Sequence, residues 1–430
     1  MSFYDLSAVL VTLAAFFSYV NYRYIRLPST IGLMALSLVL SLALLFLGKE
    51  GFFLLDDEVR QLLGHLDFYD TLMHGMLSFL LFAGALHVNF GDLLGRKWII
   101  FLLATAGVLI STLLVGGMTW LCLSLLGLNL PLLYCLLFGA LISPTDPIAV
   151  LGIMKKVGAP KDLETTIAGE SLFNDGMGVV VFLALLGMLH NGGNPDFREI
   201  ATMLAVEAGG GLLFGAALGY GCYLLLKRVD KYQIEVLLTL ATVVGGYRLA
   251  ELLHISAPLA IVVAGLLVGN HGRHFGMSPL TRGHLDSFWE LMDESLNAIL
   301  FVLIGLEILI LPHDLRFISA TLLLIPVVLL ARFLSVGSTV TVLRRFRNFP
   351  TGTVRILSWA GLRGGISVAL ALSLPNGPER NALVTITYGI MTFSILVQGL
   401  TVGKMVHRFM VTAKEEELSP TPESGLESEQ

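Results

Sequence analysis

The sequence predicts an all-α protein that crosses a membrane many times. Hydrophobic residues make up 55% of the 430 residues and charged residues only 14%, whereas soluble domains carry about 25% charged residues. Two acidic stretches, TDP at 145–147 and GESLFND at 169–175, lie inside segments that are apolar enough to span a bilayer. An ionisable group at that depth is costly unless it has a partner or a function. These observations predict a polytopic membrane protein that moves an ion.

Thirteen apolar segments approach the length of about 20 residues that a hydrocarbon core of ~30 Å requires. They lie near 6–22, 31–48, 68–88, 98–125, 131–153, 168–190, 201–226, 233–253, 255–270, 287–311, 317–341, 353–375 and 381–406. We expect them to form one membrane domain over residues 1–410. The segment 411–430 is acidic and poor in apolar residues, which predicts a short disordered tail.

Basic residues in the loops between these segments predict the orientation of the chain. Nineteen Lys and Arg residues fall in loops on one side of the membrane and only five on the other. Because basic loops stay in the cytoplasm, the N-terminus is expected outside and the C-terminus inside, in the cytoplasmic membrane. The net charge of -5 indicates no basic surface for nucleic acid.

Two of the thirteen segments are interrupted. The fifth carries Pro144 and Pro147 around a Thr-Asp pair, and each proline frees a carbonyl about one turn earlier. The twelfth carries Gly361, Gly364 and Gly365. The fifth and twelfth segments would correspond if segments one to six and eight to thirteen were inverted six-helix repeats. Paired broken helices in corresponding halves point to the midplane site of a transporter.

The sixth segment presents hard oxygen ligands. Ser171 and Asp175 lie one turn apart, as do Glu170 and Asn174, so that a short stretch carries a hydroxyl, an amide and two carboxylates. Such oxygens, together with carbonyls freed in the fifth segment, suit a sodium ion. A buried carboxylate can instead take a proton. Cation and proton would then compete for one group, which is sufficient for coupled exchange.

Two arginines within the apolar segments need acidic or structural partners. Arg332 lies in the middle of the eleventh segment, and Glu170 is its candidate partner. Arg363 is either a second partner or compensates charge in the broken twelfth segment. Simpler interpretations remain open: Asp-Pro is a common turn signal, Ser171 and Asn174 could link helices by hydrogen bonds, and Glu170 could pair with nearby lysines at the surface.

Four motifs occur in this order along the chain: TDP at 145–147, GESLFND at 169–175, ARFLS at 331–335 and GLRGGISVALAL at 361–372. With them the chain resembles the NhaP-type monovalent cation/proton antiporters, which are related to animal sodium/proton exchangers. The resemblance covers roughly residues 5–410. It implies thirteen helices, a six-helix transport domain that slides against a dimerisation domain, and a homodimer.

The resemblance also implies roles for individual residues. The sodium ion would lie at Asp175, Asp146, Ser171 and the backbone of Thr145. Asn174 would be the neutral member of an Asn-Asp pair typical of the electroneutral branch, and Glu170 with Arg332 would form a structural ion pair near the site. One departure concerns the third segment, where some relatives have a glutamate and this chain offers Ala83 and Asn89.

The sequence therefore predicts a sodium/proton antiporter that works by alternating access, most simply with one cation exchanged per proton. It predicts no enzymatic step and no organic cofactor. A potassium/proton exchanger with the same site is the nearest alternative, and Li⁺ is a further candidate cation. An intramembrane aspartyl protease with Asp146 and Asp175 as its dyad is disfavoured because the GxGD and YD patterns are absent. A channel is disfavoured by titratable carboxylates in place of carbonyl filter loops.

Overall fold

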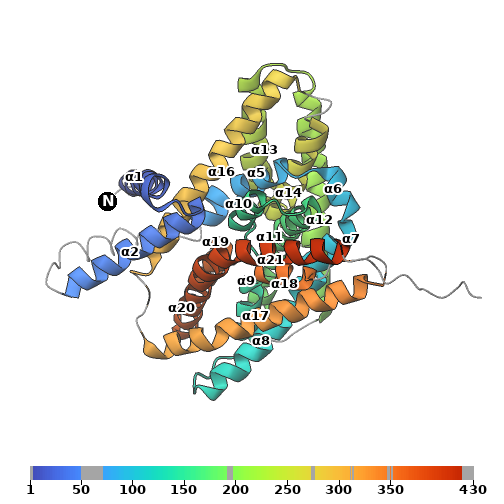
Figure 1. The fold of residues 1–430 in the computed structure, drawn as a ribbon. Coiled ribbons are helices and arrows are strands. Elements are labelled where there is room, and N and C mark those ends of the chain that lie inside the picture. Colours follow the sequence, from blue (N-terminus) through green and yellow to red (C-terminus); the bar gives the residue numbers. More distant parts are fainter. Residues whose placement is uncertain are drawn as a thin grey trace, which may run out of the picture.

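The computed structural model of the chain is almost entirely helical (Figure 1). It describes residues 3–49, 71–190, 197–272, 277–309, 311, 314–345, 349 and 352–418. Within these ranges the only strand-like pairing is an isolated antiparallel bridge between Asp146 and Leu362. The predicted all-α fold class is confirmed.

The first half of the chain forms helices that end with the long helix α11. They are α1 (Phe3–Val20), η1 (Asn21–Ile25), α2 (Ser29–Lys49), η2 (Thr71–Met76), α5 (Leu77–Leu86), α6 (Phe90–Gly95), α7 (Lys97–Ala104), α8 (Ala106–Leu125), α9 (Leu132–Ile142), α10 (Ile148–Val157) and α11 (Lys161–His190). The elements labelled η are π-helical turns.

The second half contains three helices of about 30 residues and a second broken pair. Its elements are α12 (Phe197–Leu226), α13 (Tyr232–Leu252), α14 (Ala257–Leu267), η3 (Val268–Gly272), α16 (Pro279–Glu307), α17 (Leu315–Leu343), α18 (Thr353–Trp359), α19 (Gly365–Leu372), α20 (Pro378–Phe393), η4 (Ser394–Gln398) and α21 (Gly399–Leu418).

Each of the thirteen predicted membrane segments coincides with one to three successive helices. In the described part of the chain, seven helices are long and apolar enough to cross a membrane on length and composition alone. Helices α13 and α16 are long enough but carry more polar and charged residues, and the other remaining segments are shorter or broken. The count of thirteen crossings and the inverted repeat therefore stay predictions. Residues 68–70 of the third segment lie outside the described residues.

Local sequence signals explain where several helices begin and end. Ser256 and Ser278 cap α14 and α16 by accepting hydrogen bonds from backbone N–H groups in the first turn, and a proline follows each cap. Asp314 caps α17 in the same way. Gly158 ends α10 with a φ of 73°, a left-handed conformation that favours glycine.

Helix α11 lies near the middle of the bundle (Figure 1) and contacts α7, α9, α12 and α14. Small residues permit close approach between these helices, as is common where lipid surrounds a bundle. A Cβ atom on Gly176 of α11 would lie 2.6 Å from a methyl group of Leu259 in α14. A Cβ on Gly265 of α14 would lie 2.8 Å from Ala85 in α5. The polar residues of α11 are therefore held at fixed positions inside the bundle.

The C-terminal boundary differs from the prediction. Helix α21 continues to Leu418, so that the first part of the segment 411–430, which was expected to be disordered, is helical. Ala413, Lys414 and three glutamates are strong helix formers, and they extend the apolar helix that precedes them. Residues 419–430 lie outside the described residues.

Candidate functional site

Two broken helices cross at the centre of the candidate site. Helix α9 ends at Ile142 and α10 begins at Ile148, while α18 ends at Trp359 and α19 begins at Gly365. The two connecting stretches meet where the Asp146 N–H donates to the Leu362 carbonyl at 2.7 Å. The breaks predicted in the fifth and twelfth segments are thus present, and they lie against each other.

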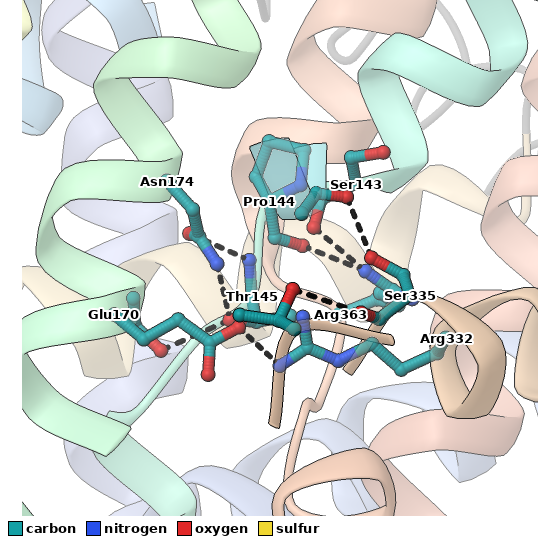
Figure 2. Close-up of polar contacts among 11 residues, drawn as sticks. Ser143, Pro144, Thr145, Glu170, Asn174, Arg332, Ser335 and Arg363 are labelled. Carbon is teal, nitrogen blue, oxygen red and sulfur yellow. Dashed lines mark hydrogen bonds and ion pairs between the residues drawn. The ribbon is translucent and has the colours of Figure 1, made fainter. Parts of the chain in front are cut away.

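Pro147 and Asp146 each leave one carbonyl group of the first break free for Arg363. Pro147 has no N–H to donate to Ser143 one turn earlier. The N–H of Ile148, which would bond to Pro144 in a continuous helix, instead donates to Asp146 Oδ1 at 2.9 Å. Figure 2 shows the consequence: Arg363 Nη1 donates to the Ser143 carbonyl at 2.9 Å and to the Pro144 carbonyl at 3.3 Å. The guanidinium thereby compensates the negative C-terminal end of α9.

Glycines in the second break allow the two stretches to touch. A Cβ atom on Gly364 would lie 2.8 Å from the Cβ of Asp146. A Cβ on Gly361 would lie 2.9 Å from Arg332 Nε and 3.2 Å from the Thr145 methyl group. Side chains at these two positions would push the broken helices apart. Since α10 and α19 both begin here, their positive N-terminal ends lie close to Asp146.

Helix α11 holds the first break through Asn174, which lies beside Thr145 in Figure 2, and through Ser171. The Thr145 N–H donates to Asn174 Oδ1 at 3.2 Å, and Asn174 Nδ2 donates to Thr145 Oγ1 at 2.8 Å. Thr145 Oγ1 also lies 3.0 Å from Ser171 Oγ. The amide of Asn174 can satisfy both atoms of Thr145 because it carries a donor and an acceptor.

We expect Asn174→Ala to destabilise the protein by about 1–3 kcal/mol, because it strands the buried N–H of Thr145 and leaves the Thr145 hydroxyl only Ser171 as a partner. Thermal unfolding in detergent should show the loss, and hydrogen exchange should be faster for the backbone of 143–147. Asn129→Ala, at an exposed loop asparagine, is the matched control and should change neither measurement. Unchanged exchange at 143–147 in Asn174→Ala would show that these bonds do not hold the break.

The two predicted aspartates lie near each other but differ in environment. Asp146 is partly exposed, and its carboxylate accepts a hydrogen bond from the Ile148 N–H at the start of α10. Asp175 is only 8% exposed, and within the described part of the chain no hydrogen-bond donor reaches its carboxylate. The two carboxylates are close enough for their charges to repel each other. Asp175 therefore has two oxygens free for a cation or a proton.

Glu170 and Arg332 are brought together from α11 and α17 (Figure 2). Arg332 Nη2 lies 2.5 Å from Glu170 Oε1, and both side chains are almost fully buried. Arg332 also lies against Gly361, so the ion pair connects α11 to the second break. Arg363 lies within electrostatic range of both members of the pair.

Several polar residues near the site were not predicted. Ser394 Oγ accepts a hydrogen bond from the Arg363 N–H at 3.0 Å, and it donates to Gln398 Oε1 at 2.6 Å. Their signal in the sequence is a serine and a glutamine one turn apart within an apolar segment. Asp293 in α16 was missed as well, although it lies within electrostatic range of Asp146.

The two positions noted in the third segment, Ala83 and Asn89, serve packing and helix capping. Ala83 of α5 is fully buried. Asn89 caps α6, accepting hydrogen bonds from the Gly91 and Asp92 N–H groups at 2.8 and 3.2 Å. Neither position supplies a carboxylate, so the acidic groups of the site come from other helices.

The ligand atoms that the arrangement offers to a cation are all oxygens: two carboxylates, two hydroxyls and those carbonyls of the unwound stretch that Arg363 does not bind. This donor set suits hard monovalent cations and contains no thiolate or imidazole. Irregular backbone is tolerated at membrane depth where it lines a cavity or is buried in protein. The site can therefore exchange a bound cation for a proton on a carboxylate.

Comparisons with known proteins agree with this geometry. The family model described as "Sodium/hydrogen exchanger, transmembrane" matches residues 11–408. The chain is 54% identical over 408 residues to the Na(+)/H(+) antiporter NhaP of Pseudomonas aeruginosa, which covers 94% of this chain and 96% of the relative. It is 32% identical over 399 residues to the Na(+)/H(+) antiporter NhaH of Halobacillus dabanensis, covering 90% and 93%. The sodium proton antiporter MjNhaP1 from Methanocaldococcus jannaschii has the same fold, with a TM-score of 0.72, 19% identity and coverage of 94% and 97%.

Proposed function

The chain belongs to the transmembrane sodium/hydrogen exchanger family, and we propose that it exchanges Na⁺ for H⁺ across the cell membrane with Asp175 as the shared binding group. The observation that carries this proposal is the buried Asp175 carboxylate beside the crossing of two broken helices. Relatives that the chain matches along most of their length are named Na⁺/H⁺ antiporters.

The ionised Asp175 carboxylate binds the cation. Asp146, Ser171 and Thr145 supply the other oxygens, with the unwound backbone of the first break completing the shell. Asn174 acts through Thr145, because both polar atoms of its amide are engaged there. When a proton binds Asp175, the carboxylate loses its charge and the cation leaves. Competition for one group couples the two fluxes without any enzymatic step or organic cofactor.

Buried arginines keep the neighbourhood of this carboxylate in place. Arg363 compensates the carbonyls at the end of α9, and Glu170 and Arg332 neutralise each other. None of these three groups has to change its charge during the cycle. In alternating access, the crossing and its attached helices would move as a unit within a homodimer. The excess of basic residues in the loops on one side supports an external N-terminus and a cytoplasmic C-terminus.

Potassium remains the rival cation, because the same oxygens can bind it and only the size of the cavity discriminates. The protease alternative has no support beyond the proximity of Asp146 and Asp175. Membership of a transporter family speaks against it.

In proteoliposomes that contain the purified chain, a Na⁺ gradient should drive proton movement at the same initial rate with and without a potassium/valinomycin clamp. If Asp175 is the only carboxylate that alternately binds Na⁺ and H⁺, the site is neutral with either ion bound. The membrane potential, worth about 2.3 kcal/mol per charge per 100 mV, then does no net work on the cycle.

Replacing Na⁺ by Li⁺ or K⁺ in the same assay identifies the cation, and empty liposomes are the control. Absence of cation-driven proton movement for all three ions would reject the antiporter. A rate that depends strongly on the imposed potential would instead reject the electroneutral stoichiometry, and would mean that Asp146 or Glu170 carries a second charge.

A further inference from the structure

One face of α16 leads to the crossing of the broken helices. Asp293, Asn297, Leu300 and Ile304 follow one another at spacings of four, three and four residues, which places them along one side of a helix. The far end of this face contacts the second break: a Cβ atom on Gly365 would lie 2.9 Å from Leu300 and 3.2 Å from Ile304. Asp293 and Asn297 therefore lie on the side of α16 that faces the site.

Asn297 has an unused acceptor at this place. Its Nδ2 donates to the Asp293 carbonyl at 2.8 Å and to Asp293 Oδ1 at 3.1 Å. The residue is 4% exposed, and its Oδ1 has no hydrogen-bond partner in the described part of the chain. Buried amide oxygens are normally satisfied by a donor or an ion. The head group of Asn297 thus presents a free oxygen beside a carboxylate.

Asp293 adds a negative charge next to the site already described. Its carboxylate lies within electrostatic range of Asp146, and Asp146 in turn lies within range of Asp175. Asp293 and Asp146 are partly exposed, whereas Asp175 is buried. Two carboxylates that repel each other in a partly dry environment attract a cation between them. Asp293 and Asp146 are thus the more accessible acids of the three, and Asp175 is the least accessible.

We propose that Asp293, Asn297 and Asp146 form a second site for a monovalent cation, an outer station from which the ion passes to Asp175. The ligands would be the two carboxylates and Asn297 Oδ1, all hard oxygens that suit Na⁺. Asp146 would be shared by both stations. This inference rests on the proposed function and adds a step to it: the outer station raises the local cation concentration and lowers the KM for Na⁺.

The test is the Na⁺ dependence of exchange by the full chain in proteoliposomes, with KM and Vmax measured separately. Asp293→Asn should raise the KM for Na⁺ about tenfold, which corresponds to a loss of roughly 1.4 kcal/mol, with little change in Vmax. Asn297→Ala should raise the KM as well, and Asp293→Glu should restore a value near that of the wild type. Glu294→Gln removes the exposed acid next in sequence, and as the matched control it should leave both constants unchanged.

Screening provides a second readout. The Debye length is about 10 Å at 0.1 M salt, so added choline chloride screens the attraction between the Asp293 carboxylate and Na⁺. The salt should therefore narrow the difference in KM between the wild type and Asp293→Asn. An unchanged KM in Asp293→Asn, or a lower Vmax at unchanged KM, would overturn the outer station while the exchange itself persists. Wild-type protein that moves no protons in response to Na⁺ would instead reject the proposed function.

Discussion

Replacing Asp175 by asparagine is expected to reduce Na⁺-driven proton movement to the background of empty liposomes. An amide can neither take up a proton nor balance the charge of a bound cation. Withdrawing the partner of a buried charge costs about 3–5 kcal/mol, and each 1.4 kcal/mol is about tenfold in binding. The loss should therefore exceed a hundredfold at any Na⁺ concentration that the assay can reach. The measurement is the initial rate of proton release.

The same variant should be at least as stable as the wild type. In the described part of the chain Asp175 has no hydrogen-bond donor, and a buried carboxylate without a partner opposes folding. Thermal unfolding in detergent would then show an unchanged or higher midpoint for Asp175→Asn. Glu164→Gln, in the first turn of the same helix, is the control and should keep full activity. Persistent exchange in folded Asp175→Asn would remove Asp175 from the mechanism.

The positions of the two helix breaks could be predicted because backbone chemistry alone sets them. Pro144 and Pro147 lack the donors that a continuous helix needs, and the glycines at 361, 364 and 365 weaken the twelfth segment. These signals are local and need no knowledge of neighbouring helices. The buried pair of Glu170 and Arg332 could also be proposed, since a charge in the middle of an apolar segment needs an opposite charge.

The way in which the breaks meet could not be predicted. Asp146 bonds to Leu362, far away in the sequence, and no local pattern specifies that register. The same holds for Arg363. Its partners are backbone carbonyls, which every residue carries, so no residue type in the sequence marks them. Asp293 was missed for a different reason: in FWELMDESLN it lies among several charged residues and looks like part of a solvated helix face. Only the contacts of α16 distinguish it from Glu294.

The extent of α21 was mispredicted because composition and helix propensity point in different directions there. A run of glutamates is typical of disordered tails, and the same residues extend a helix that already exists, since propagation is easier than nucleation. The apolar part of α21 supplies that nucleus. Helix α11 likewise begins at Lys161, ahead of the predicted segment at 168, because the polar residues between them continue the helix beyond its apolar part.

Neutralising Glu170 should destabilise the protein more than neutralising Arg332. Each single change strands a buried charge, at a cost of about 3–5 kcal/mol. The two costs differ because Arg363 lies within electrostatic range of both residues. In Glu170→Gln, two arginines face each other without an acid between them, whereas in Arg332→Gln the glutamate retains Arg363 as a partner. Thermal unfolding in detergent should rank the variants in this order.

The double variant Glu170→Gln/Arg332→Gln should be milder than the sum of the two single changes, since neither charge is then stranded and the two amides can hydrogen bond to each other. A double-mutant cycle measures this coupling directly. Arg248→Gln, which breaks a pair whose arginine side chain is 69% exposed, is the control and should cost less than about 1 kcal/mol. Strict additivity at Glu170 and Arg332 would show that their proximity contributes nothing to stability. Equal losses of stability in the two single variants would show that Arg363 does not interact with Glu170. Its positive charge would then interact only with the carbonyls of Ser143 and Pro144.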